Sequence, residues 1–193
     1  MYFNNNPGDT MDTRNIVVDY VKYRLERNGY VWQNGPAMEN GASRVCNTMR
    51  SIGDEFEERY RSQFEEMGNQ LHITPTTAYP TFHAIVNELF ADGVNWGRVV
   101  ALFTFGGSLA VRCFEQDMPQ IVDSIIDWVS TYADNNLSQW ISSQSGWEGF
   151  VAFYEQGPEK RNENPWPSLR QICGYAAGAI GVLTLGAILT QKS

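Results

Sequence analysis

The run from Val99 to Val111 constrains the fold most, because its thirteen residues carry no charge. Wound into a helix, it presents apolar or small side chains on every side, and such a helix needs neighbours all round. Thirteen helical residues are too short to cross a bilayer. The run therefore predicts the central helix of a bundle, with the other helices packed around it.

The rest of the chain repeats its apolar residues at the helical period, and no run alternates at the period of a strand. The sequence predicts an all-α fold: a globular bundle of about seven or eight amphipathic helices around a central apolar helix, followed by a hydrophobic C-terminal tail helix. Asp12 or Thr13 is expected to cap the first helix, Gly29 to end it, and Ser145 with Glu148 to form a capping box. Around the central helix, the predicted helices or apolar stripes cover Thr13 to Asn28, Val45 to Met67, Phe82 to Phe90, a helix opened by Pro119 and running through Tyr132, Leu137 to Ser142, and Trp147 to Tyr154.

The C-terminal segment from Ile172 to Thr190 is apolar or small throughout and is flanked by Arg170 and Lys192. It is just long enough to span a bilayer, so we expect a tail anchor inserted after translation. A helix folded onto its own domain is the alternative. The expected organisation is a flexible N-terminus (1–12), a helical bundle (13–157), a linker (158–169) and a membrane anchor (170–193).

The composition narrows the classes of partner. The formal net charge is -8 and the basic residues form no cluster, which argues against nucleic acid and favours proteins or membranes. Three distant cysteines, Cys46, Cys113 and Cys173, lie in apolar helical patterns, which is typical of reduced thiols in an intracellular protein. The N-terminus shows no secretory signal.

The segment Asn95-Trp96-Gly97-Arg98 opens the central helix and places a cation at the N-terminus of that helix. With Asn95 as the N-cap, Arg98 lies in the first turn, where the helix dipole disfavours a positive charge by about 0.3–1 kcal/mol. This position predicts a carboxylate partner, from this chain or another. A solvated arginine is the alternative.

Catalysis is not expected. The sequence GGSLA (Gly106 to Ala110) is close to a nucleophile elbow, but both histidines, His72 and His83, precede Ser108. The histidines and cysteines do not have the spacing of a zinc site, and there is no glycine-rich nucleotide loop. We expect neither a metal nor a cofactor.

Four segments together resemble the Bcl-2 family of apoptosis regulators. IVVDYVKYRLERNGY is similar to the fourth homology motif, VCNTMRSIGDEFEERY to the third or death motif, NWGRVVALFTFGG to the first, and WISSQSGWEGFVAFY to the second. Their order, their spacing and the hydrophobic tail carry the resemblance, which covers nearly the whole chain from Thr13.

The resemblance implies a surface groove that accepts the amphipathic death-motif helix of a partner, with the partner's aspartate on Arg98. The implied partners are pro-apoptotic relatives, both death-motif-only proteins and Bax/Bak-like effectors; a homodimer is also expected. By spacing alone, the aromatic residues of this set are explained equally well as residues of the hydrophobic core. The implied groove residues are Phe56, Tyr60, Phe64, Met67, Ile85, Glu88, Leu89, Asn95, Gly97, Arg98, Ala101, Phe105 and Tyr154.

The third motif has two interpretations. Its stripe is expected to pack inside the bundle, but if it became exposed it could dock into the groove of another family member. This internal death motif comprises Val45, Met49, Ile52, Gly53, Asp54 and Phe56.

The resemblance favours a pro-survival protein that sequesters death-motif partners. A Bax/Bak-like effector that forms membrane pores is the alternative, since NWGRVVALF also resembles that class and Arg112 stands where pro-survival relatives usually carry glutamate. The implied location is the cytoplasmic face of the mitochondrial outer membrane, with the endoplasmic reticulum membrane and the cytosol as further sites.

Overall fold

The computed structural model describes residues 12–33, 35–36, 42–70 and 73–157. The predicted linker and membrane anchor, together with Cys173, lie outside these ranges, so the anchor stays a prediction. Over the described residues the secondary structure is helical, without a strand, as the sequence predicts. The helices are α1 (Thr13–Arg27), α2 (Arg44–Arg59), α3 (Arg61–Gln70), α4 (Ala78–Leu89), α5 (Trp96–Glu115), α6 (Val122–Tyr132), α7 (Ser138–Ser143) and α8 (Gly146–Glu155), with a 3-10 turn at Pro119–Ile121 and a π segment at Ala133–Leu137.

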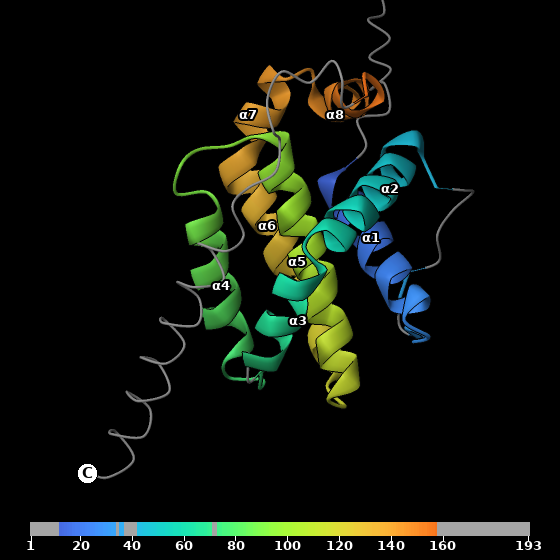
Figure 1. The fold of residues 1–193 in the computed structure, drawn as a ribbon, viewed down its shortest axis with the longest axis vertical. Helices are drawn as coiled ribbons and strands as arrows, with labels where there is room; N and C mark the ends of the chain where they lie inside the picture. The colour runs from blue at the N-terminus through green and yellow to red at the C-terminus, as the bar shows by residue number, and fades with distance from the viewer. Residues whose placement is uncertain (1–11, 34, 37–41, 71–72, 158–193) are drawn as a thin grey trace, which may run out of the picture.

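The predicted central helix is α5. It packs against α1, α2, α4 and α6, and in Figure 1 it runs between α1 and α2 on one side and α4 and α6 on the other. The helix has 20 residues, and an 18-residue stretch of it has a mean hydropathy of 1.3, so it is long and apolar enough to cross a membrane. However, 78% of that stretch is buried inside the protein. This burial confirms the prediction of a core helix.

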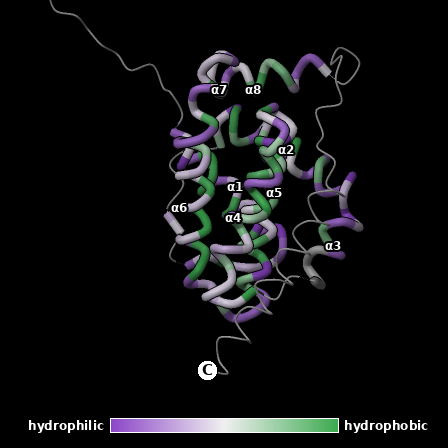
Figure 2. Tube along the Cα trace, turned by 90° about the vertical axis from the view of Figure 1, so that its left-hand side faces the viewer, coloured by the Kyte–Doolittle hydropathy of each residue, from purple (hydrophilic) through white to green (hydrophobic). Residues whose placement is uncertain are grey.

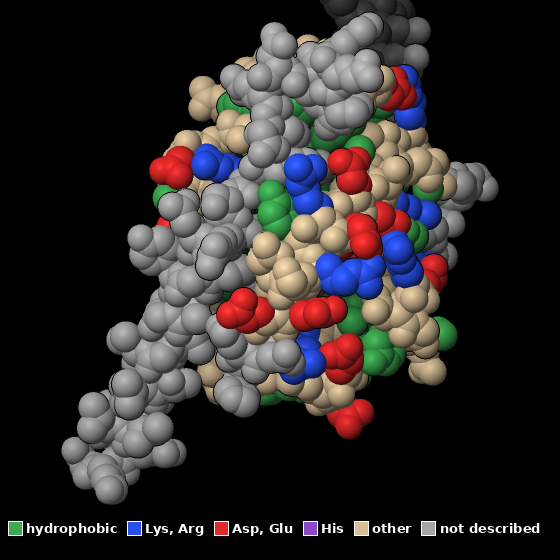
Figure 3. Space-filling model, in the orientation of Figure 1, with side chains coloured by type: hydrophobic (Ala, Val, Ile, Leu, Met, Phe, Trp, Pro, Cys, Tyr) green, Lys and Arg blue, Asp and Glu red, His purple; other side chains and the backbone are tan. Residues whose placement is uncertain are grey.

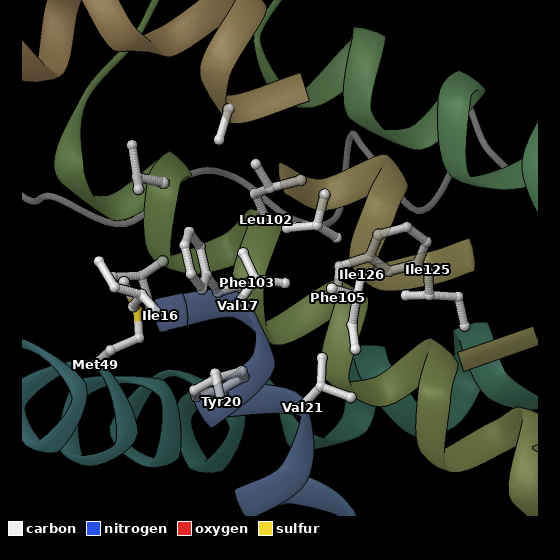
Figure 4. Packing of buried hydrophobic residues seen from close by; sticks show 14 of the residues in the cluster. Ile16, Val17, Tyr20, Val21, Met49, Leu102, Phe103, Phe105, Ile125 and Ile126 are labelled. Atoms are coloured by element: carbon white, nitrogen blue, oxygen red, sulfur yellow. The ribbon is translucent and has the colours of Figure 1, made fainter. Parts of the chain in front are cut away.

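The core forms where the apolar stripes of four helices meet. Figure 4 shows α1 and α2 side chains pointing toward those of α5 and α6, and Figure 2 shows the hydrophobic stretches along the helices. Fully burying one such side chain contributes about 1.5–3 kcal/mol. Members of this core include Ile16, Val17 and Tyr20 of α1, Met49 of α2, Leu102 and Phe103 of α5, and Ile125 and Ile126 of α6.

The helix ends follow the predicted signals in most places. The Asp12 side chain accepts a hydrogen bond from the Arg14 backbone at 3.2 Å, and Gly29 follows α1 with a φ of +82°. Positive φ costs glycine little because it has no Cβ. The N-terminal cap and the C-terminal stop of α1 are thus confirmed.

One local prediction is wrong, and two are refined by the structure. The apolar stripe from Val45 to Met67 extends over two helices, because the backbone leaves helical geometry at Tyr60, between α2 and α3. Pro119 opens the next helical segment as predicted, through a 3-10 turn that leads directly into α6. Ser145 forms no capping box, since it adopts a left-handed φ of +69° and its side chain makes no cap hydrogen bond.

Candidate ligand-binding site

Arg98 lies in the first turn of α5, as predicted. The Asn95 side chain caps the helix by accepting a hydrogen bond from the Arg98 backbone at 2.9 Å. The Arg98 side chain is only 16% exposed, so it is not a solvated surface arginine. The α4–α5 connection and the start of α5 therefore build a partly sheltered cation.

The partners of the Arg98 guanidinium come from the same connection. Nη1 donates to the backbone oxygen of Gly93 at 2.7 Å, whereas Nη2 lies 3.4 Å from the carboxylate of Asp92, whose side chain is 87% exposed. The buried Nε has no hydrogen-bond partner among the described residues. Nε and Nη2 form one edge of the guanidinium, the edge that a carboxylate binds with both oxygens. This edge is thus only weakly occupied.

The predicted groove residues of α2 and α3 form an aromatic cluster. Phe56 is fully buried, and its ring centre lies 4.8 Å from that of Tyr60 and 6.0 Å from that of Phe64. Tyr60 and Phe64 are partly buried. Of the Met67 side chain nothing is described. The break at Tyr60 therefore lies inside this cluster.

The predicted groove residues of α4 and α5 are mostly buried in the same conformation. Ile85, Leu89, Ala101 and Phe105 are buried, and the Phe105 ring stacks on Phe82 of α4 at 6.1 Å. Burial of this kind also fits the interpretation of these side chains as core. Asn95 and Glu88 are partly buried, Gly97 is buried, and Tyr154 of α8 is buried with its ring 5.1 Å from that of Phe150.

A cavity of about 480 Å³ lies at one end of the predicted set. It is lined by Phe64 of α3 and Phe105 of α5, but not by Arg98. Its rim is ionic, with four arginines and five carboxylates from α1, α2, α3 and α5. Figure 3 shows acidic and basic side chains interleaved over the face that carries α1, α2 and α3. This cavity therefore lies toward the Phe105 end of the predicted groove, away from Arg98.

The internal death motif packs inside the bundle. Val45, Met49, Ile52 and Phe56 are all buried. A Cβ at Gly53 would collide with the Tyr20 hydroxyl, so glycine allows α1 and α2 to approach closely. This confirms the packed interpretation for the described conformation.

The sequence analysis missed the ionic interface between α1 and α2. Arg50 forms two hydrogen bonds with Asp19, at 2.8 and 2.5 Å, and Asp19 is 1% exposed. The Tyr23 hydroxyl donates to Asp54 at 2.5 Å, and Arg27 pairs with the same carboxylate. The signal was the presence of Asp19 and Arg24 within the apolar pattern of the first helix.

One end of this interface is strongly desolvated. Arg24 pairs with Glu57, and its Nη1 lies 3.7 Å from Asp54. Burial raises the pKa of Glu57 above its usual 4.5, although the Arg24 charge and a hydrogen bond from Ser108 oppose that shift. Burial also raises the pKa of the Cys113 thiol to about 11 and that of Cys46, so both free thiols are poor nucleophiles.

The described part of the chain contains no group of three or more histidine, cysteine, aspartate or glutamate side chains that could hold a metal ion. What the described residues offer is a sheltered arginine beside apolar helices. Such an arrangement suits the binding of an amphipathic helix with a carboxylate.

Comparison with known proteins identifies the family. Residues 49–147 match the apoptosis regulator proteins of the Bcl-2 family, and residues 10–34 match Bcl-2 homology region 4. The chain is 37% identical to Apoptosis regulator R1 of Xenopus laevis over 94% of this chain and 80% of that protein. It is 36% identical to Bcl-2-like protein 1 of Gallus gallus, over 93% of this chain and 98% of that protein. The human Bcl-2-like protein 1 is 33% identical, over 95% of this chain and its own full length.

These matches cover the first and fourth motifs in full and parts of the third and second, and the relatives extend over nearly the whole chain. The all-helical bundle around α5 agrees with them. The chain belongs to the Bcl-2 family of apoptosis regulators.

Proposed function

We propose that this protein is a pro-survival regulator that binds the death-motif helices of pro-apoptotic relatives and so restrains permeabilisation of the mitochondrial outer membrane. The single observation that carries the proposal is Arg98: a sheltered guanidinium whose Nε has no hydrogen-bond partner among the described residues and whose Nη2 meets only the exposed Asp92, at 3.4 Å. A partner aspartate would complete it with a charge-assisted hydrogen bond.

The groove for the rest of the ligand helix runs down α5 from Arg98. Ala101 and Phe105 follow Arg98 at three and seven residues, so the three side chains share one face of the helix. Seven residues of helix span about 10 Å, which is two turns of a ligand helix laid alongside. Apolar ligand side chains at helical spacing would supply most of the affinity.

Binding requires the groove to open, because Phe56, Leu89 and Phe105 are buried in the described conformation. The element suited to move is α3, which makes its main contact with α2 and borders the cavity of about 480 Å³. A ligand that binds only the open form shifts the population toward it. We therefore expect the bound form to differ in the position of α3 relative to α4 and α5.

The proposal is tested by cytochrome c release from isolated mitochondria, with the full-length protein added alone and together with an activated Bax-type effector. Suppression of effector-driven release, with no release by the protein itself, is the expected result. Release by the protein alone, on mitochondria that lack other effectors, would instead make it a pore-forming effector.

We place the bundle on the cytoplasmic face of the mitochondrial outer membrane, with the endoplasmic reticulum membrane and the cytosol as further sites. The uncharged stretch from Ile172 to Thr190 supports a membrane anchor, and the resemblance to the family implies the choice of membrane. Deletion from Ile172 onward should move the protein to the soluble fraction of cells. Carbonate-resistant membrane association of the truncated protein would refute the anchor.

A further inference from the structure

The last turn of α2 carries a carboxylate that joins three helices. Glu57 pairs with Arg24 of α1 and accepts a hydrogen bond from the Ser108 hydroxyl of α5 at 3.3 Å. The side chains of Glu57 and Arg24 are 19% and 9% exposed, so solvent screens their interaction weakly. This contact set therefore ties the end of α2 to both α1 and α5.

The proposed groove begins next to this carboxylate. Phe56 precedes Glu57, Tyr60 lies at the break three residues later, and Phe64 follows one turn into α3. Neighbouring residues of one helical turn move together, so a shift of Glu57 shifts the Phe56 and Tyr60 rings. Because α3 makes its main contact with α2, the position of Phe64 depends on the same turn.

Stability does not account for the buried pair. Burial raises the pKa of Glu57 in spite of the neighbouring Arg24, so desolvation of the ionised carboxylate outweighs its attraction to the cation. Buried ion pairs of this kind are weak evidence for stability, and in some proteins they serve to fix a geometry. The geometry fixed here is the path of α2 as it enters α3.

We propose that Glu57 is a positioning residue for ligand binding, which holds the last turn of α2 against Arg24 and Ser108 and thereby places the aromatic rings of the groove. The inference rests on the proposed function, because it concerns the same groove. Glu57 itself touches no ligand in this scheme.

The charge of Glu57 then makes ligand affinity depend on pH. Protonation removes the charge pair with Arg24, so affinity should fall as the pH is lowered. The groups that face Glu57 or share its cavity are Tyr20, Arg24 and Arg27 of α1, Asp54 and Glu58 of α2, Arg61 and Glu65 of α3, and Ser108, Arg112 and Glu115 of α5. A glutamine at position 57 keeps the side-chain shape but cannot titrate.

The test compares Glu57→Gln with Glu58→Gln in the full-length protein. Glu58 is the matched control, since its side chain is 69% exposed and pairs with the exposed Arg61. The probe is a fluorescent peptide with the death motif of a Bax-type effector, and its affinity is measured from about pH 7.5 to about pH 5. We expect Glu57→Gln to weaken binding about fivefold at neutral pH and Glu58→Gln to change it less than about twofold.

The pH profile separates positioning from a general loss of structure. Wild-type affinity should fall toward that of Glu57→Gln at low pH, while the variant itself should show a flat profile. Arg24→Lys, which keeps the charge, should retain more affinity than Arg24→Met. If Glu57→Gln fails to fold, Ser108→Ala decides, because it removes only the hydrogen bond and should weaken binding by a smaller factor.

Equal affinities and equal pH profiles for Glu57→Gln and wild type would overturn the inference. If Glu57→Gln does not fold, the inference is overturned when Ser108→Ala binds the peptide as tightly as wild type and the wild-type affinity does not change with pH. A wild-type protein that does not bind the peptide at any pH would overturn the proposed function itself, which is a different result.

Discussion

Arg24 and Arg98 are both largely buried, but their surroundings differ. Arg24 lies between two carboxylates of α2, Asp54 and Glu57. Arg98 reaches a backbone oxygen and, at 3.4 Å, a carboxylate that lies mostly in water. The charge of Arg24 is thus balanced by sheltered carboxylates, whereas that of Arg98 is balanced only weakly, by an exposed one. The difference suggests that Arg24 organises the bundle and Arg98 serves a ligand.

The largest effect is expected at Arg24. Arg24→Met should lower the free energy of unfolding by about 3 kcal/mol, because it leaves the largely buried carboxylate of Glu57 without its cation. Arg98→Met should lower it by less than about 1 kcal/mol, since no buried carboxylate depends on Arg98. Urea unfolding followed by circular dichroism measures both. Equal losses would remove the distinction between the two arginines.

For ligand binding, in contrast to stability, a large effect is expected at Arg98. The affinity of Arg98→Ala for a death-motif peptide should drop at least about tenfold, or 1.4 kcal/mol, because the partner's carboxylate loses its cation. Isothermal titration calorimetry with the folded variant gives the number. Unchanged affinity in a folded variant would defeat the assigned role of Arg98.

A smaller effect should appear in the pH dependence of stability. The pKa of Glu57 is raised by burial, so the folded protein keeps its proton at pH values where the unfolded chain has released it. The contribution of Glu57 to the free energy of unfolding therefore falls as pH rises above 4.5 toward the raised pKa. Urea unfolding of wild type and of Glu57→Gln across this pH range isolates the contribution of Glu57 to the free energy of unfolding. Parallel curves would show that Glu57 is not the group responsible.

The smallest effect is expected at Asp92. Its side chain is 87% exposed and 3.4 Å from Arg98, so Asp92→Asn should change the free energy of unfolding by less than about 0.5 kcal/mol. A high-precision thermal melt is sufficient. A loss comparable with that of Arg24→Met would mean that Asp92 balances Arg98 after all.

Much of the fold was predictable because it depends on local patterns. The charge-free run of α5, the cap at Asn95 and the stop at Gly29 all lie where the sequence predicts them. The break at Tyr60 was not predictable, since the apolar spacing continues through it into α3. A periodic stripe identifies a buried face but does not say whether the helix beneath it is continuous.

The candidate site divides in the same way. Position in the first turn of α5 was enough to single out Arg98 and its need for an acceptor. The burial of Phe56 and Phe105 could not be predicted, because spacing describes the face of the helix on which a ring lies and not what covers that ring. That a partner helix replaces the side chains that now cover these rings stays a prediction.

The sequence by itself determined the all-helical bundle, its central helix and the family, since helical periodicity and motif order are properties of the linear chain. Only the tertiary structure decided the charged contacts, above all Asp19 with Arg50 and Arg24 with Glu57. Periodicity assigns charged residues to an outer face, but two such faces can meet. Which charges are paired, and which cation is left for a ligand, depends on how neighbouring helices approach, and no single helix encodes that.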